Sequence, residues 1–259
     1  MIVVITGATS GIGEETAKYY VSKGHTVYSL ARRKKDVEGI NYISCDLSKN
    51  EEIEKAAKDI IEKEGKIDLL INNAGMGTSG AFEYHTNEDI EYLIKVNITG
   101  LLVTSKVFIP YLRKSHGKII NISSVAGVIA IPFQAMYSLS KSAVLFFTEA
   151  LRNELRPYKV GVTAVLPGDT KTGFTDARKK SEDHNEYGER INRSVSRMEK
   201  DEQNGVAPIK VAKKIYKVSL KKKPNTYYVV GFGYSFLCLL SRILPKRLVN
   251  WIIYQIYGK

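Results

Sequence analysis

The chain is poor in residues that cross-link a fold or bind a metal. Its 259 residues include two cysteines, Cys45 and Cys238, which lie far apart in the sequence and form neither a disulfide framework nor a metal-ligand spacing. The four histidines are scattered, so we predict no metal site. Residues 2–6 follow Met1 without the basic start and long apolar core of a signal peptide. We therefore expect a reducing, cytoplasmic environment.

Acidic residues are missing from the last part of the chain. The net charge is +12, and residues 203–259 hold 11 Lys or Arg and no Asp or Glu, which leaves 28 basic and 27 acidic residues in the first 202. A basic balance is one sign of a nucleic-acid partner. No nucleic-acid-binding motif accompanies it, so we expect no such partner. Nearly all of the excess positive charge lies in residues 203–259.

Apolar runs typical of strands alternate with amphipathic patterns typical of helices. The expected strands are residues 2–6, 25–31, 41–47, 66–75, 117–124, 159–168 and 226–230. The expected helices are residues 14–24, 51–65, 86–114, 135–156 and 211–220. This alternation predicts an α/β fold, a Rossmann-type doubly wound parallel sheet with helices on both faces. Ligands bind such sheets at the carboxyl ends of the strands.

No repeat or linker divides the chain, so we predict a single domain over residues 1–259. Residues 170–204 are polar, charged and too long for an ordinary connection. We expect them to form a lid over the substrate, an inserted helical piece or a disordered segment. Residues 225–259 form an apolar, basic C-terminal extension.

A glycine-rich stretch, GATSGIG at residues 7–13, lies between the first expected strand and the first helix. Glycine permits a tight turn and a close approach of the backbone to a ligand. The helix N-terminus that follows offers free N–H groups to a pyrophosphate. A glycine turn without a ligand is the alternative, but the place directly after the first strand favours a dinucleotide site.

The second expected strand ends in LARRKK, without the acid that usually binds the ribose 2′-hydroxyl of NAD. Arg32 and Arg33 stand there instead, and a guanidinium pairs with a phosphate through two hydrogen bonds. A solvated run of charges is the alternative interpretation. We predict NADP(H) as the cofactor in preference to NAD(H).

Ser124, Tyr137 and Lys141 form the chemically most suggestive set. Tyr137 and Lys141 are one helical turn apart and share a face of the helix. A free phenol has a pKa of about 10, and a neighbouring ammonium lowers that pKa, which makes the tyrosine a general acid or base. Ser124 ends the fifth strand, where its hydroxyl can hydrogen-bond a carbonyl oxygen. Alone, a Tyr-x-x-x-Lys pair is usually just an exposed pair on a helix.

Together these motifs resemble those of the short-chain dehydrogenase/reductase family. TGATSGIG matches the family's TGxxxGxG, residues 72–75 its NNAG and residues 137–141 its YxxSK; Asn97 stands in KVNITG, as the family's active-site asparagine does. The resemblance covers residues 2 to about 175. The expected cofactor contacts are Gly7, Thr9, Ser10, Gly11, Ile12, Gly13, Arg32, Arg33, Asp46, Leu47, Asn73, Ala74, Gly75, Tyr137, Lys141, Pro167, Gly168, Thr170 and Thr172.

The resemblance also implies a role for each of four catalytic residues. Tyr137 exchanges a proton with the substrate oxygen, and Lys141 lowers the tyrosine pKa and binds the ribose hydroxyls. Ser124 orients the carbonyl group, and Asn97 holds a water that links Lys141 to solvent. The implied reaction is the reduction of a ketone or the oxidation of the corresponding secondary alcohol by hydride transfer.

The resemblance further implies a sheet of about seven strands and a homodimer or homotetramer built on two long helices. We expect a small-molecule substrate, bulky or lipid-like, whose pocket is shaped by residues 125–136 and 173–204. A non-catalytic regulator that binds NADP(H) is the competing hypothesis. The unsubstituted set of Asn97, Ser124, Tyr137 and Lys141 argues against it.

The C-terminal extension allows two interpretations. One is that part of it adds a seventh strand and closes over the substrate pocket. The other starts from Trp251 and several Tyr, Ile and Leu residues beside Arg242, Lys246 and Arg247, with no acid to oppose them. A basic, aromatic amphipathic segment lies in the headgroup layer of anionic membranes or forms an oligomer contact. Its uncharged run, residues 224–241, contains glycines and is marginal for a spanning helix.

Overall fold

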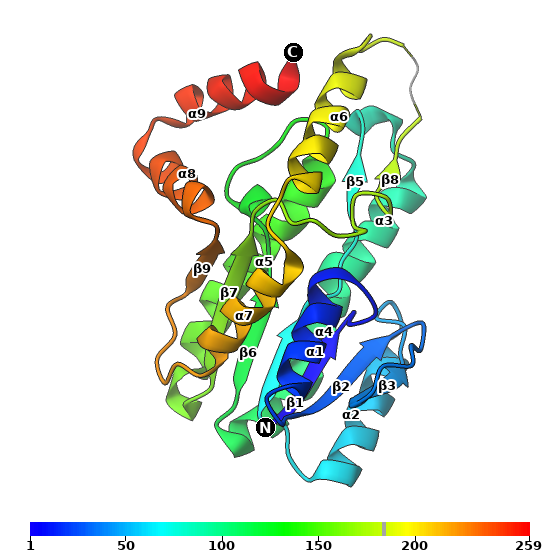
Figure 1. Cartoon of the computed structure of the whole chain (residues 1–259), viewed down its shortest axis with the longest axis vertical. Coiled ribbons are helices and arrows are strands. Elements are labelled where there is room, and N and C mark those ends of the chain that lie inside the picture. The colour runs from blue at the N-terminus through cyan, green and yellow to red at the C-terminus, as the bar shows by residue number, and fades with distance from the viewer. Residues whose placement is uncertain (183–184) are drawn as a thin grey trace.

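The strands of this chain form one main parallel sheet, as the sequence predicts. The computed structural model describes residues 1–182 and 185–259 (Figure 1). Within them, seven strands lie in the order β3-β2-β1-β4-β6-β7-β9. Their bounds are β1 (Ile2–Thr6), β2 (Thr26–Ala31), β3 (Ile40–Ser44), β4 (Leu69–Asn72), β6 (Lys118–Ile122), β7 (Gly161–Pro167) and β9 (Tyr227–Val230). The strand order reverses between β1 and β4, which places a ligand crevice at their carboxyl ends.

Helices cover both faces of the sheet because its strands are apolar on both faces. One layer comprises α1 (Gly11–Val21) and α7 (Pro208–Ser219); the other comprises α2 (Asn50–Glu64), α4 (Gly100–Ser115) and α5 (Ala135–Leu155) (Figure 1). Along β1 the side chains alternate between the layers. Val3 and Ile5 lie in the core with α1 and α7, whereas Val4 lies in the core with α2 and α4. Each face therefore has its own apolar core.

The predicted long helix over residues 86–114 is continuous but contains a π-helical turn. Thr86 caps α3 (Asn87–Ile94) by accepting a hydrogen bond from Asp89 N, and the π turn η2 (Lys95–Thr99) joins α3 to α4. The span Asn87–Ser115 is long and apolar enough to cross a membrane, judged by length and composition. Phe108 and Leu112 are nevertheless fully buried against the sheet, so it is a core helix of this fold.

The expected lid contains an inserted helix and a short strand. Strand β8 (Lys179–Lys180) pairs in parallel with β5 (Thr78–Ser79), and α6 (Arg190–Gln203) follows. Helix α6 is rich in charge, but Ile191, Val195 and Met198 line one face and are buried together with Ala81. Residues 183 and 184 of the predicted lid lie outside the described residues. Short 3₁₀ turns occur at η1 (Phe82–Tyr84), η3 (Val125–Gly127) and η4 (Arg156–Tyr158).

The C-terminal extension begins as the expected seventh strand and ends as two helices. Strand β9 pairs with β7 at the edge of the sheet. Helix α8 (Phe232–Ile243) follows, and then come α9 (Lys246–Ile253) and the π turn η5 (Tyr254–Gly258). Pro245 precedes the first turn of α9, where its missing N–H costs nothing. Figure 1 shows α8 and α9 at one side of the molecule, beyond β9.

Candidate active site

Ser124, Tyr137 and Lys141 meet at the carboxyl end of β6. Ser124 lies two residues beyond that strand in extended conformation, and α5 starts just before Tyr137. The Ser124 side chain lies close enough to Tyr137 to act on its phenol. Lys141 Nζ lies 5.7 Å from the centre of the Tyr137 ring, one turn further along α5. The structure therefore gathers the three side chains into one cluster.

Asn97 reaches the same cluster from the π turn. Its Nδ2 donates to Met76 O (2.9 Å) and Ser140 Oγ (3.0 Å), and its Oδ1 accepts from Met76 N (2.8 Å). A methyl group at Gly75 would lie 3.4 Å from both Asn97 Oδ1 and Lys141 Nζ. Gly75 thus lies beside both polar groups, and Asn97 ties the turn after NNAG to α5.

Burial dominates the protonation of the tyrosine and the lysine. Desolvation raises the pKa of the Tyr137 phenol to about 12, although the nearby Ser124 side chain acts to lower it. Desolvation also lowers the pKa of the Lys141 ammonium to about 8. Lys141 Nζ donates to Ile122 O (3.0 Å). In the protein alone, the pKa of the phenol is therefore raised, whereas the spacing to Lys141 predicts a lowered pKa. The reason is that the phenolate loses more stabilisation by solvent than it gains from neighbouring positive charge.

The glycine-rich stretch forms a tight turn between β1 and α1. Gly7 and Gly11 have positive φ angles of 69° and 54°. A methyl group on Gly13 would lie 2.4 Å from both Gly7 O and Asn73 Nδ2, so only glycine fits. The Ser10 side chain does not cap α1. The turn can therefore offer the first N–H groups of α1 to an anion.

The NNAG motif braces this turn from the neighbouring strand. Asn73 Nδ2 donates to Thr6 O (3.0 Å) and Gly7 O (3.1 Å). The backbone N–H groups of Asn73 and Ala74 both donate to Thr6 Oγ1 (2.9 and 3.0 Å). The motif therefore joins the carboxyl ends of β1 and β4, on either side of the crevice where the strand order reverses.

Arg32 and Arg33 are exposed directly after β2. Arg32 Nη1 donates to the Tyr92 hydroxyl (2.6 Å), which holds the guanidinium beside the glycine-loop edge of the sheet. Nearby, burial raises the pKa of Asp46, but hydrogen bonds from Ser48 and the charge of Arg32 bring it below its ordinary value. Asp46 is therefore ionised, and Leu47 beside it is buried.

The segment after β7 passes close to the glycine loop. Pro167 ends β7, and a side chain on Gly168 would overlap the Tyr234 ring. Thr170 Oγ1 donates to Gly168 O (2.9 Å). The Thr172 side chain lies 3.3 Å from the position of a methyl group on Gly11. The structure thus brings both threonines of this segment to the predicted cofactor crevice.

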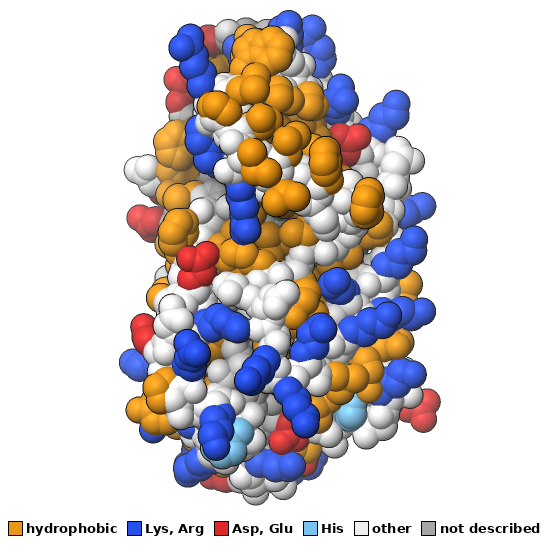
Figure 2. All heavy atoms as spheres, turned by 90° about the vertical axis from the view of Figure 1, so that its left-hand side faces the viewer, with side chains coloured by type: hydrophobic (Ala, Val, Ile, Leu, Met, Phe, Trp, Pro, Cys, Tyr) orange, Lys and Arg blue, Asp and Glu red, His pale blue; other side chains and the backbone are white. Residues whose placement is uncertain are grey.

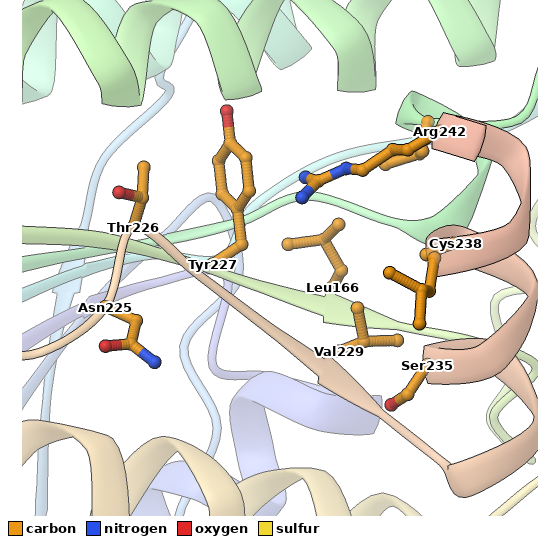
Figure 3. A pocket seen from close by; sticks show the side chains of 10 residues that line it. Leu166, Asn225, Thr226, Tyr227, Val229, Ser235, Cys238 and Arg242 are labelled. Carbon is orange, nitrogen blue, oxygen red and sulfur yellow. The ribbon is translucent and has the colours of Figure 1, made fainter.

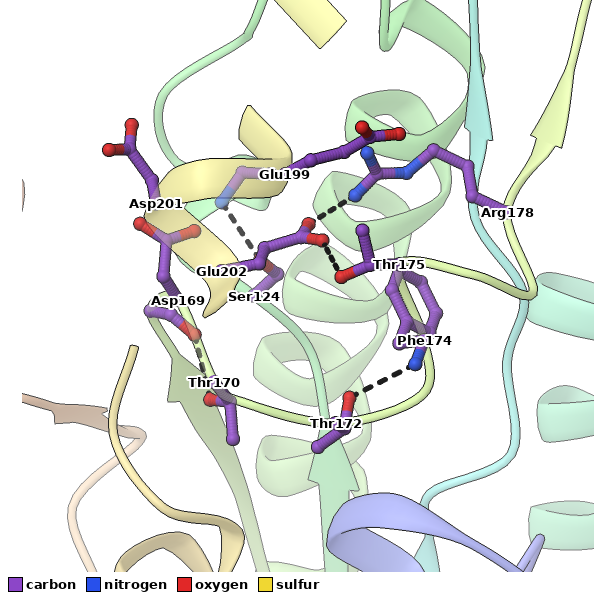
Figure 4. A network of polar contacts seen from close by, with 12 residues as sticks. Ser124, Asp169, Thr170, Thr172, Phe174, Thr175, Arg178, Glu199, Asp201 and Glu202 are labelled. Atoms are coloured by element: carbon purple, nitrogen blue, oxygen red, sulfur yellow. Dashed lines mark hydrogen bonds and ion pairs between the residues drawn. The ribbon is translucent and has the colours of Figure 1, made fainter. Parts of the chain in front are cut away.

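The sequence interpretation did not identify the residues that cover Tyr137. The Phe174 ring centre lies 5.6 Å from that of Tyr137. Glu202 of α6 accepts hydrogen bonds from Thr175 and from Arg178, whose side chain is almost completely buried (Figure 4). Within the described chain, Arg178 Nε and Nη1 have no hydrogen-bond partner.

The charges of Glu202, Arg178 and Asp169 all act on the Tyr137 phenol. Asp169 accepts a hydrogen bond from the Tyr234 hydroxyl, so α8 also contributes to this network. The one sequence signal was spacing, since Glu202 extends the buried row of Ile191, Val195 and Met198 on α6.

A separate cavity of about 330 Å³ lies between the sheet edge and α8. Leu166, Val229 and Cys238 form its apolar walls, and Arg242 reaches across it from the end of α8 (Figure 3). Its lining includes none of the four catalytic candidates. It is therefore a second hollow, behind the segment that follows Ser124.

Comparisons with known proteins agree with this geometry. The family model described as short chain dehydrogenase matches residues 1–183. The 3-ketodihydrosphingosine reductase of Bacteroides thetaiotaomicron is 41% identical over 263 residues, covering 99% of this chain and 98% of that protein. The probable short-chain type dehydrogenase/reductase VdlC of Helicobacter pylori is 32% identical and covers 94% and 93%.

Solved structures share the fold over its whole length. A short-chain dehydrogenase from Streptomyces avermitilis superposes with a TM-score of 0.86 at 25% identity, covering 99% of this chain and 96% of the other. Structures of similar fold include complexes with NAD and with NADP.

Proposed function

Since the chain belongs to the short-chain dehydrogenase family, we propose that it is an NADP(H)-dependent oxidoreductase that reduces a long-chain ketone or oxidises the corresponding secondary alcohol. The observation that carries this proposal is the cluster of Ser124 beside the Tyr137 phenol with Lys141 beside the ring. The cluster lies next to the glycine turn, at the strand ends where open α/β sheets bind ligands. The assembled set supports a catalyst over a non-catalytic regulator.

The residues of the crevice fit a nicotinamide dinucleotide. Gly13 leaves space that a methyl group would fill, and the uncapped start of α1 suits a pyrophosphate. Asp46, Leu47 and the NNAG turn would hold the adenine half, and residues 167–172 would hold the nicotinamide half. When bound, the cofactor supplies the hydride for reduction or accepts it in oxidation.

NADP(H) rather than NAD(H) is proposed because of the groups that follow β2. Arg32 and Arg33 are exposed there, and the sequence has no acid at the strand end to bind a 2′-hydroxyl. Tyr92 holds Arg32 by a hydrogen bond. A guanidinium held in this way suits the planar, two-point recognition of a phosphate.

Tyr137 is proposed to give its phenolic proton to the carbonyl oxygen during reduction and to take it back during oxidation. Ser124 can hydrogen-bond the same oxygen and stabilise the charge that develops on it. Lys141 is held by Ile122 O, and its lowered pKa lets it return a proton near neutral pH. Asn97 orients the turn beside Lys141.

We propose 3-ketodihydrosphingosine, or a closely related long-chain keto base, as the substrate. A relative named for that substrate aligns with nearly the whole chain. Such a molecule carries a ketone between an alkyl chain and an amino-alcohol head. Val125 and Ile129 offer an apolar wall for the alkyl chain, and the charges of Asp169 and Glu202 near Tyr137 favour an ammonium head.

A homo-oligomer through α4 and α5 is also proposed. These long helices cover one face of the sheet, yet Leu102, Leu139 and Phe146 are exposed on them. Exposed apolar residues on two adjacent helices suit a self-complementary contact between subunits. Light scattering of the wild type and of Phe146→Glu tests this, and a monomeric wild type would contradict it.

NADPH consumption tests the proposed function directly. We expect the purified protein to oxidise NADPH with 3-ketodihydrosphingosine much faster than with a steroid ketone or a 3-ketoacyl thioester, and to use NADH poorly. Product formation should match NADPH loss one to one. Binding of NADPH with no turnover of any ketone would instead support the non-catalytic regulator.

A further inference from the structure

The helices α8 and α9 present a large apolar face to solvent. Phe232 is 93% exposed, Ile243 is 70% exposed and Trp251 is 58% exposed. Six more large apolar side chains of this segment are at least one-third exposed, namely Phe236, Leu237, Leu239, Leu248, Tyr254 and Ile256. Figure 2 shows the hydrophobic side chains gathered over this part of the molecule. Contiguous apolar surface of this kind marks a binding surface.

The inner side of the same helices packs against the rest of the protein. Cys238 and Val249 are buried, and Cys238 packs with Val125 and Ile129 of the segment after β6. Tyr234 donates a hydrogen bond to Asp169 from the inner side of α8. The helices are therefore anchored by one side, and the exposed apolar residues on the other side are not needed for that anchoring.

Three cations border this face, and its segment contains no acid to oppose them. Arg242, Lys246 and Arg247 lie where α8 meets α9. Residues 203–259 contain no Asp or Glu. The face therefore combines exposed aromatic and aliphatic side chains with uncompensated cations, the composition of helices that lie in the interface of anionic bilayers.

We propose that the outer face of α8 and α9 docks onto the surface of an anionic lipid bilayer. Helix α8 has 12 residues and α9 has eight, so each is too short to span a membrane and both must lie along its surface. The cations match the negative potential of anionic headgroups. Docking of this kind would attach the protein peripherally to the membrane.

The charge distribution disfavours a second copy of the chain as the occupant. A two-fold contact brings the same patch of both subunits together. The contact would then bring together two patches that both carry Arg242, Lys246 and Arg247, with no acid in either segment to neutralise them. Like charges placed opposite each other oppose association.

Docking would also place the substrate wall next to the lipid. Helix α8 packs directly on Val125 and Ile129, the proposed wall for the alkyl chain. The 330 Å³ cavity beneath α8 is partly apolar, with Arg242 reaching across it (Figure 3). This last step rests on the proposed function, whereas membrane docking itself does not require catalysis. Binding and activity can therefore fail independently.

Trp251 offers a direct readout because it is the only tryptophan in the chain and lies on the proposed face. We expect its emission to shift to the blue, and brominated lipid to quench it, when the wild type meets phosphatidylglycerol-containing vesicles at low salt. Phosphatidylcholine vesicles should give a much weaker response. High salt should weaken binding to the anionic vesicles.

Two variants separate the apolar and charged contributions. Phe232→Ser with Phe236→Ser and Ile243→Ser should abolish co-sedimentation with anionic vesicles, whereas Phe82→Ser, an exposed aromatic outside the face, should not. Neutralising Arg242, Lys246 and Arg247 to Gln should weaken binding about fivefold for each charge removed.

Three outcomes would overturn the proposal. One is a wild type that neither shifts in emission nor sediments with anionic vesicles at low salt. Another is unchanged binding by the triple serine variant. A third is a wild-type oligomer that this variant dissociates without any vesicle binding, which would assign the face to a second copy. NADPH turnover with soluble ketone, measured in parallel, reports separately on the proposed function.

Discussion

Residues 2–172 and residues 173–259 differ in which side chains they bury and which they expose. In the first region, apolar strands are covered on both faces, and polar side chains such as Asn73 and Asn97 are hydrogen-bonded to backbone. In the second, α6 buries the charged pair of Arg178 and Glu202, while α8 and α9 expose large apolar residues. The first region, whose core α7 and β9 complete, therefore leaves few groups unsatisfied, whereas the second also carries features that a ligand or a surface would explain.

Tyr137→Phe should have the largest effect, and it tests the first region. The change removes only the hydroxyl that would exchange the proton, so NADPH binding should persist while kcat falls about 10²–10⁴-fold. Steady-state rates and fluorescence titration with NADPH measure the two properties. A variant with near-normal kcat would contradict the assignment of Tyr137.

Glu202→Ala should be the most damaging single change in the second region. It leaves the buried Arg178 guanidinium without its counter-charge, and breaking a buried pair costs about 3–5 kcal/mol of unfolding free energy. Glu199→Ala on the same helix is the matched control, because its partner Lys180 is exposed and such pairs contribute about 0–1 kcal/mol. Urea unfolding of both variants measures the difference, and equal losses would contradict the predicted importance of burial.

The lowered pKa of Lys141 predicts that the stability of the protein rises with pH over a defined window. Its pKa is about 8 in the folded protein and higher when unfolded, so between these values the unfolded state binds more protons and stability rises with pH. The window starts near pH 8 and ends near the ordinary lysine pKa of about 10.4. The free energy of unfolding of wild type minus that of Lys141→Met should therefore increase over that window, by at most about 3 kcal/mol.

A flat difference between wild type and Lys141→Met would show that solvent reaches the ammonium. Activity gives an independent check. If Lys141 returns protons to Tyr137, ketone reduction should slow as pH rises through about 8, because the ammonium is lost.

Arg32→Ala should separate the two cofactors. A charge-assisted hydrogen bond contributes roughly 1.5–3 kcal/mol, or about one to two decades in affinity, and this loss should fall on NADPH and spare NADH. Lys34→Ala removes an exposed charge from the same turn and serves as the control. Isothermal titration of both cofactors gives the ratio, and an equal loss for NADPH and NADH would contradict the role of Arg32.

The smallest effect on stability is expected from a substitution on the exposed face of α8. Its contrast with a buried residue tests directly whether that face is open to solvent. Phe236→Ala should change the free energy of unfolding by only about 0.5 kcal/mol, because the side chain already faces water. Ile215→Ala in α7, fully buried against the sheet, should cost about 2–5 kcal/mol. A large loss from Phe236→Ala would mean that the face is covered within the protein.

Much of the fold could be predicted from the sequence because the relevant signals are local. Short apolar runs such as Ile2–Thr6, alternating with helical patterns, predict strands covered on both faces, and the structure confirms the parallel sheet, its seventh strand β9 and the long helices. The apolar, acid-free composition of residues 225–259 also stands out in the sequence, but it left two interpretations open, and only the structure shows that one side of α8 and α9 is exposed.

Only the tertiary structure decided which residues of the second region meet the active site. Phe174, Arg178 and Glu202 belong to no recognisable motif, and they reach Tyr137 because β8 pairs with β5 and α6 packs on Ala81. The direction of the Tyr137 pKa shift is likewise a product of packing. The spacing of Tyr137 and Lys141 indicates a lowered pKa, but desolvation depends on every segment that covers the phenol, and those segments come from distant parts of the chain.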